Sequence, residues 1–211
     1  MHIPDGFVAP QVYLPAYLLA VGFTLLSFRK LKEAFEEGKV PYIASLSAFA
    51  FIVGSVAVPI PGGTSVHGLG VAPIALLFGP WVAYACFSIV LLLQVILLGE
   101  GGITTYPINL LAIGLVGGFS AYWFYRIFNR MAFAVFLSGF LSTLLSAIFM
   151  SILLGVHPYL FKDPSGKPLY FPYPLSLTIP AFLLPHLLVG FAEGILTHIA
   201  VKHLSKRLRH E

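Results

Sequence analysis

Long uncharged apolar runs recur along this chain and constrain its fold more than any other feature. Hydrophobic residues make up 58% of the chain and charged residues 9%, whereas a soluble domain carries about 25% charge. A helix of ~20 apolar residues crosses a bilayer with its backbone groups bonded internally, and the runs lack the alternation of a β-barrel. The sequence therefore predicts an all-α integral membrane protein. Nothing in the charge pattern indicates a nucleic-acid partner.

Glycine and proline divide these runs into seven predicted transmembrane helices. Gly79 and Pro80 interrupt the run of residues 69–98, which as one helix would measure ~45 Å, longer than the ~30 Å hydrocarbon core. We therefore divide it into a short helix and a full span, within one domain covering residues 1–211. The predicted helices cover residues 12–28, 42–58, 69–78, 81–98, 108–125, 131–154 and 177–201.

The basic residues predict how the helices are oriented in the cell membrane. With the N-terminus outside, only Lys162 and Lys167 of the twelve lysines and arginines fall on outer segments, as the positive-inside rule requires. Treating residues 69–98 as one crossing would put the basic segments before and after it on opposite faces. We therefore predict that the short helix reverses the chain, that the loop of residues 59–68 dips into the bundle, and that the basic tail, residues 202–211, is cytoplasmic.

Met1 and His2 can together offer three nitrogen ligands to one metal ion. The terminal amine and the His2 amide nitrogen close a five-membered chelate ring, and that amide with Nδ1 of the imidazole closes a six-membered one. Both rings are nearly planar because the peptide unit is planar. Square nitrogen coordination suits Ni(II) or Cu(II) rather than Zn(II) or Mg(II). The alternative is an ordinary frayed terminus. The chelate also requires a free terminal amine. We expect one because no signal-peptide pattern opens the chain.

His67 is the histidine best placed to complete the square. The predicted topology puts it on the same outer face as the N-terminus, within the turn-forming residues 59–68. Nickel bound by one deprotonated amide and three neutral nitrogens keeps one positive charge. Asp5 or Glu100 could balance that charge, and the open alternative is that both are solvated loop acids.

The polar residues within the predicted spans give little support to a function as an enzyme or a channel. His186 and Glu193 lie two helical turns apart on one face, which favours a buried hydrogen-bonded pair. An intramembrane metal hydrolase using these two with His198 is a remote alternative, because the His-Glu-x-x-His spacing of such sites is absent. A passive cation channel would need a ring or repeat of pore acids, which we do not find. We therefore expect a metal-binding protein that is not an enzyme.

Four motifs resemble the NikM/CbiM family, the substrate-binding membrane subunits of energy-coupling-factor nickel and cobalt importers. They are MHIPDGF at residues 1–7, PIPGGTSVHGLG at 59–70, FGPW at 78–81 and LLGEGGI at 97–103. The stretch LYFPYP before residue 175 looks like the nickel-type branch. The resemblance implies a six-helix core with one extra N-terminal helix, and Met1, His2 and His67 as the metal ligands.

The same resemblance implies a Ni(II)-binding subunit of an ATP-driven importer, with Co(II) as the alternative metal and no organic cofactor. The implied partners are a transmembrane coupling subunit, ATPase subunits and a small accessory membrane subunit. Ala44 and Ala48, a small-xxx-small pair, match the face on which the coupling subunit docks, although internal packing is the other explanation. The chain departs from the family pattern at Val66, where a small residue is usual, and after residue 102, where only the first asparagine of Asn-x-x-Asn-Met-Gly is kept. The residues expected around the ligands are Asp5, Ser65, Glu100 and Asn109.

Overall fold

The computed structural model describes residues 1–60, 62–128 and 131–208 and is built almost entirely of helix. Seven continuous helical runs follow one another in this part of the chain, as predicted. They are α1 (Pro10–Glu36), α2 (Val40–Ser55), α3 (Val71–Phe78), α4 (Pro80–Leu93) with the π-helix η1 (Gln94–Leu98), α5 (Tyr106–Leu110) with the π-helix η2 (Leu111–Gly117) and α6 (Gly118–Ile127), α7 (Ala132–Leu160) and α8 (Leu175–Arg207).

Five of these runs, within the described residues, are long and apolar enough to cross a membrane: α1, α4 with η1, α5 to α6, α7 and α8. The helix α2 is apolar but has 16 residues, and α3 has eight. The predicted division of residues 69–98 is confirmed, since α3 ends at Phe78 and α4 begins at Pro80. Gly79 between them has a φ of 92°, a left-handed backbone that favours glycine.

Several predicted helix ends are wrong because helix continues into polar sequence. The helix α1 extends to Glu36, beyond its predicted end at residue 28, and ion pairs one turn apart, such as Lys30 with Glu33, stabilise those turns. Similarly, α7 extends to Leu160 and contains His157, which lies beyond the predicted helix end at residue 154. Residues 202–207 of the predicted tail belong to α8, and residues 209–211 lie outside the described part.

The loop predicted at residues 59–68 contains an antiparallel β-hairpin that sequence analysis missed. Strand β1 (Val58–Ile60) pairs with β2 (Thr64–Val66), and the second predicted helix ends at Ser55 instead of residue 58. The strands are rich in β-branched residues, which fit a pleated backbone, and Gly62 and Gly63 turn the chain with φ values of 99° and 77°. Pro61 of the same loop lies outside the described residues. Because His67 directly follows β2, the hairpin fixes the position of the backbone at His67.

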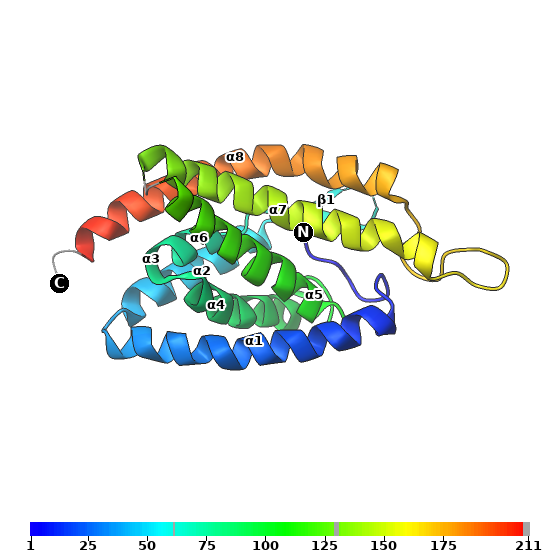
Figure 1. The fold of residues 1–211 in the computed structure, drawn as a ribbon, viewed down its shortest axis with the longest axis horizontal. Coiled ribbons are helices and arrows are strands. Elements are labelled where there is room, and N and C mark those ends of the chain that lie inside the picture. The colour runs from blue at the N-terminus through cyan, green and yellow to red at the C-terminus, as the bar shows by residue number, and fades with distance from the viewer. Residues whose placement is uncertain (61, 129–130, 209–211) are drawn as a thin grey trace.

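Helices α7 and α8 lie along each other on one side of the molecule, α1 forms the opposite side, and the shorter helices fill the space between them (Figure 1). In Figure 1, α1 and α8 run in the same direction and α7 runs in the opposite one, so the basic ends of α1 and α8 lie at one end of the molecule. The N-terminus lies inside this arrangement, and Met1 is fully buried.

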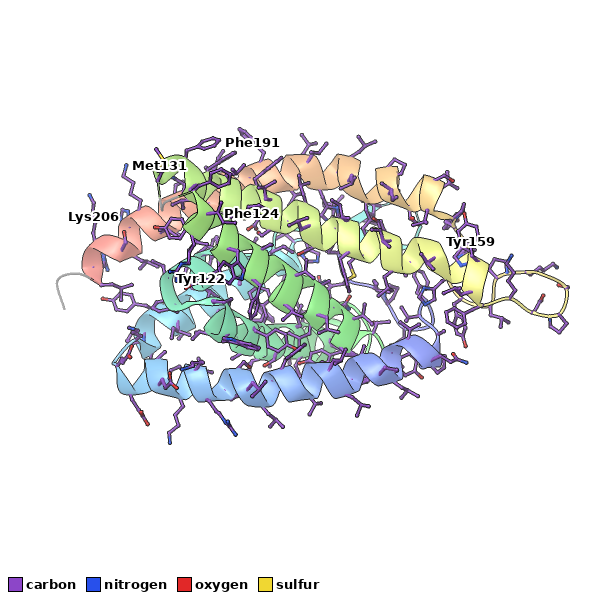
Figure 2. All side chains as sticks on the ribbon, viewed as in Figure 1. Tyr122, Phe124, Met131, Tyr159, Phe191 and Lys206 are labelled. Atoms are coloured by element: carbon purple, nitrogen blue, oxygen red, sulfur yellow. The ribbon has the colours of Figure 1, made fainter. Side chains whose placement is uncertain are left out.

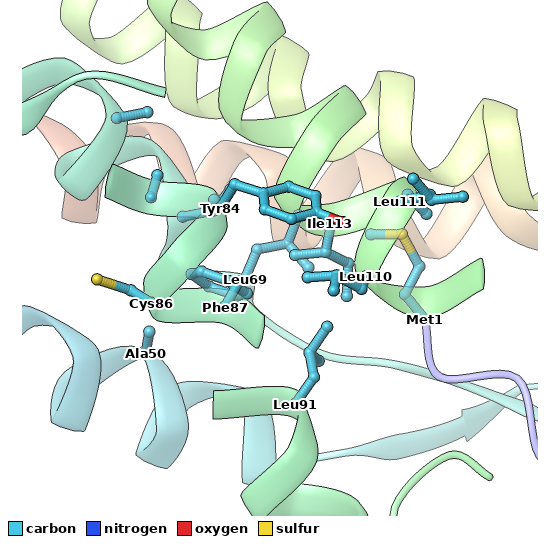
Figure 3. Close-up of a cluster of buried hydrophobic side chains, with 14 of the residues drawn as sticks. Met1, Ala50, Leu69, Tyr84, Cys86, Phe87, Leu91, Leu110, Leu111 and Ile113 are labelled. Atoms are coloured by element: carbon cyan, nitrogen blue, oxygen red, sulfur yellow. The ribbon is translucent and has the colours of Figure 1, made fainter. Parts of the chain in front are cut away.

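The outer surface is apolar and the interior is densely packed. Figure 2 shows Met131 and Phe191 projecting outward, and they are 65% and 57% exposed, as suits residues that meet lipid rather than water. Inside, Tyr84 and Phe87 of α4 pack with Leu110 of α5, and the Met1 side chain belongs to the same cluster (Figure 3). The first side chain of the protein is therefore a core residue, which holds the terminal amine in place.

Candidate metal centre

The N-terminal segment is held to the start of α5 by a reciprocal pair of hydrogen bonds. The Ile3 N–H donates to Oδ1 of Asn109 at 3.0 Å, and Nδ2 of Asn109 donates to the Ile3 carbonyl at 3.2 Å. The Thr105 hydroxyl donates to the same carbonyl. All three residues are buried. The segment is therefore fixed one residue after the predicted chelate.

Further contacts anchor the segment as it approaches α1. The Ala9 N–H donates to Nε2 of His157 at 3.3 Å. Asp5 accepts hydrogen bonds from the N–H groups of Ile103 at 3.1 Å and Thr104 at 2.8 Å. Burial alone would raise the pKa of Asp5, but these hydrogen bonds outweigh it and lower the pKa. Asp5 therefore acts as an ionised anchor for the turn that follows Glu100.

The structure brings Met1, His2 and His67 together in one buried place. The Met1 amine donates a hydrogen bond to the carbonyl of Ser65, two residues before His67. The rings of His2 and His67 stack, with centroids 4.3 Å apart. The exposed fractions of Met1, His2 and His67 are 0%, 5% and 3%. Of the predicted surrounding residues, Ser65, Glu100 and Asn109 contact this segment, and Asp5 belongs to it.

The hydrogen bonding of His67 leaves one ring nitrogen free to bind an ion. Its Nδ1 lies 2.8 Å from the Gly68 carbonyl, and since a carbonyl only accepts, Nδ1 must carry the proton. Nε2 is buried and has no hydrogen-bond partner among the described residues. In a neutral imidazole that nitrogen carries a lone pair directed into the protein interior.

His2 also has unpaired ring nitrogens. Both are buried without a hydrogen-bond partner in the described part of the chain, and Nδ1 lies 3.5 Å from Oε2 of Glu100. Buried polar atoms in folded proteins nearly always have a partner. Each neutral imidazole carries one ring-nitrogen lone pair. Two such lone pairs beside one buried amine therefore indicate a site that can receive a positively charged ligand, with Glu100 close enough to offset the charge.

Burial shifts these groups toward their metal-binding forms. It lowers the pKa of the Met1 amine well below its usual value, while Glu100 opposes the shift. Burial also lowers the pKa of His67, and the nearby Met1 amine and His2 ring add to the effect. The neutral amine and neutral imidazole carry the lone pairs that ligate metals. Protons therefore compete less for this site than they would for an exposed peptide terminus.

No group of three or more His, Cys, Asp or Glu side chains suited to a metal ion occurs in the residues that the structure describes. For a metal ion held by His2 and His67, the Met1 amine and the His2 amide of the same segment can supply two main-chain nitrogens. Such a donor set consists entirely of nitrogen, which favours square-planar Ni(II) or Cu(II).

The predicted pair between His186 and Glu193 does not form, because each side chain bonds to main chain instead. Nδ1 of His186 bonds the Phe182 carbonyl one turn back, at 2.6 Å, whereas Glu193 reaches across to the start of α3. His198, the third residue of the hydrolase alternative, bonds the Ala132 carbonyl at 3.2 Å.

His186 nevertheless lies near the candidate metal ligands. It is fully buried, its Nε2 is without a partner among the described residues, and it is within electrostatic range of the Met1 amine and His67.

Ala44 and Ala48 are exposed residues of α2. They line an apolar cavity of about 540 Å³ between α2 and α4, together with Phe51 and Cys86. Among the described contacts, α2 packs on its neighbours less than the longer helices do, which leaves this face open.

The sequence matches the model of a family described as CbiM, cobalt uptake substrate-specific transmembrane region, over residues 2–211. The chain belongs to this CbiM family. The fused nickel transport protein NikMN of Rhodobacter capsulatus is 38% identical over 206 residues, which cover 93% of this chain and 59% of the relative. The cobalt transport protein CbiM of Thermosipho melanesiensis is 28% identical over 215 residues, covering 100% of this chain and 89% of that one.

Solved structures agree with membership of the CbiM family. A truncated transition metal transporter superposes with a TM-score of 0.93 at 33% identity, covering 98% of this chain and 99% of that chain. The resemblance found in the sequence is confirmed, and the multi-pass membrane architecture fits it. The chain spans about 59% and 65% of the lengths of two fused nickel transport relatives. CbiM-family relatives include nickel and cobalt transport proteins.

Proposed function

We propose that this chain captures Ni(II) as the cargo-binding membrane subunit of a metal importer. One observation carries the proposal: the buried Met1 amine, His2 and His67 converge, with imidazole nitrogens that have no partner among the described residues. Co(II) is the alternative cargo, supported by the cobalt transport proteins among the relatives. An all-nitrogen square that includes an amide suits Ni(II) better.

The proposed square uses the amine of Met1, the amide and Nδ1 of His2, and Nε2 of His67. To bind, the amine exchanges its bond to the Ser65 carbonyl for the metal, and the His2 amide loses its proton. Deprotonation reduces the charge of the complex from +2 to +1. Glu100, already beside Nδ1 of His2, brings the site near neutrality, which matters because an uncompensated charge in a buried site is costly.

The proposed import cycle has the N-terminal segment outside the cell and the basic ends of α1 and α8 in the cytoplasm, as the positive-inside rule indicates. ATPase subunits and a transmembrane coupling subunit supply the work, and a small accessory membrane subunit assists. The open face of α2 around Ala44 and Ala48 is the proposed contact for the coupling subunit. Metal uptake by vesicles that contain this chain without ATPase partners would contradict this cycle.

The deciding experiment is a Ni(II) titration of detergent-purified protein with and without one extra residue before Met1. We expect one-to-one binding with a square-planar absorption band, lost on extension and strongly weakened by His67→Ala. His203→Ala is the matched control, because His203 is exposed near the end of α8, and it should bind as the unchanged protein does. Equal binding by the extended and unextended proteins would remove the amine from the site and refute the proposal.

A further inference from the structure

Glu193 is a buried acid, 2% exposed, in the middle part of α8. Carboxylates within membrane helices are costly and usually serve a function. Although it lies near His186 on the same helix, Glu193 makes its hydrogen bonds elsewhere. Its Oε1 accepts the N–H of Leu69 at 2.7 Å, and its two oxygens accept the N–H of Gly70 at 3.2 and 3.1 Å. Glu193 therefore holds the chain between His67 and α3.

One peptide group connects Glu193 to His67. The N–H that Leu69 donates to Glu193 belongs to the same peptide group as the Gly68 carbonyl, and that carbonyl accepts the Nδ1–H of His67 at 2.8 Å. The hydrogen bonds thus run in series from carboxylate to peptide to imidazole. Bonds in such a series polarise and strengthen one another. The series ends at Nε2 of His67, the nitrogen left bare for a metal.

The surrounding backbone leaves this peptide group little freedom. A Cβ added to Gly68 would lie 2.7 Å from Oε1 of Glu193 and 2.2 Å from Cγ1 of Val53. Gly70 has a φ of 68°, and a Cβ there would lie 2.9 Å from the Cα of Ala50. The chain after His67 therefore passes through a narrow space between α2 and α8, where only glycine fits and where the carboxylate sets the peptide orientation.

We propose that Glu193 is the positioning residue for the metal-binding histidine. Acting through the Gly68–Leu69 peptide group, it keeps the proton of His67 on Nδ1 and Nε2 available to the ion. The inference rests on the proposed function, in which His67 is a ligand. Metal-binding histidines commonly donate their other N–H to a carboxylate or a carbonyl, which fixes the tautomer and makes the imidazole more basic. Here one peptide group is inserted between the carboxylate and the imidazole.

The test uses the full chain, purified in detergent, with two substitutions of graded effect. Glu193→Met keeps a similar length but removes both acceptors, and Glu193→Gln keeps one acceptor oxygen. The control is Ser146→Ala, which removes a buried hydrogen bond to the Ala112 carbonyl at 2.8 Å between α7 and η2. Ni(II) affinity and the absorption band are measured, together with the ¹⁵N shifts of His67 without metal, assigned by their absence in His67→Ala.

We expect Glu193→Met to weaken Ni(II) binding about 10–100-fold, the range for residues that orient a metal ligand, and Glu193→Gln to weaken it less. In the unchanged protein the ¹⁵N shifts of His67 should report a single tautomer with Nδ1 protonated. In the Glu193 variants they should report a mixture of the two tautomers. Ser146→Ala should leave both the affinity and the shifts unchanged even if it lowers the melting temperature. A role of Glu193 in stability alone would not alter the tautomer.

The inference is overturned if the Glu193 variants keep the affinity and the tautomer of the unchanged protein while His67→Ala loses binding. If His67→Ala also binds normally, the proposed metal site itself is wrong. Should Glu193→Met fail to fold, Glu193→Gln decides alone, since it preserves shape and one acceptor: normal affinity with an unchanged tautomer contradicts the inference, and weakened binding with a tautomer mixture supports it.

Discussion

The imidazole rings of His2 and His67 stack face to face, with centroids 4.3 Å apart and planes inclined by 21°. His2 arrives on the N-terminal segment and His67 on the β-hairpin, so this contact joins the start of the chain to the loop after α2. Stacking buries both rings together, but their planes are nearly parallel. Binding one ion requires the ring planes to open until their lone pairs converge, so the pocket must allow a small ring movement.

Asn109→Ala should weaken Ni(II) binding roughly tenfold. It removes both hydrogen bonds to Ile3, and each buried bond contributes about 0.5–1.5 kcal/mol. The N-terminal segment then spends part of its time away from His67. Titration measures the affinity, and Ser138→Ala, which loses a buried bond within α7, is the control. Unchanged affinity in Asn109→Ala would mean that other contacts alone hold the segment.

Ni(II) affinity should rise with pH, and binding should release about one proton near neutral pH, since a peptide amide must be deprotonated to bind. Burial lowers the pKa values of the Met1 amine and His67, so both are neutral at lower pH than in an exposed peptide and contribute little to the protons released. Calorimetry in buffers with different ionisation enthalpies counts the protons. Release of no proton would exclude the amide as a ligand.

Glu100→Gln should weaken Ni(II) binding roughly tenfold, equivalent to about 1.4 kcal/mol, because the complex then keeps its positive charge in a buried site. Glu37→Gln, which removes a charge from an exposed pair with Lys39, should bind normally. The two titrations are compared at the same ionic strength. Equal affinities would show that Glu100 does not compensate the metal charge.

Gly68→Ala should destabilise the protein by about 1–3 kcal/mol, the usual cost of overpacking, and should weaken Ni(II) binding as well. The new methyl group collides with Val53 and Glu193, so the chain after His67 must shift. Gly22→Ala is the control, since nothing lies within 4 Å of the added Cβ and alanine favours helix. Thermal unfolding with and without metal measures both effects, and a Gly68→Ala protein as stable as Gly22→Ala would contradict the close packing.

The helical part of the fold could be predicted because its signals are local. Apolar runs specify helices that satisfy their own backbone, and Gly79 with Pro80 marks the break between α3 and α4. Helix ends were less predictable, because charged pairs such as Lys30 with Glu33 extend helix beyond the apolar run. The β-hairpin was missed because three-residue strands are too short to show a period, and their pairing depends on the turn between them.

The sequence alone determined the membrane helices and the chemistry that a methionine-histidine terminus can offer, because both follow from neighbouring residues and covalent geometry. Only the tertiary structure decided that the His2 ring stacks on His67, that Glu100 lies beside them, and that Glu193 bonds Leu69, which is 124 residues away. Contacts over such separations depend on how helices pack, and packing sums many weak interactions that no short stretch of sequence contains.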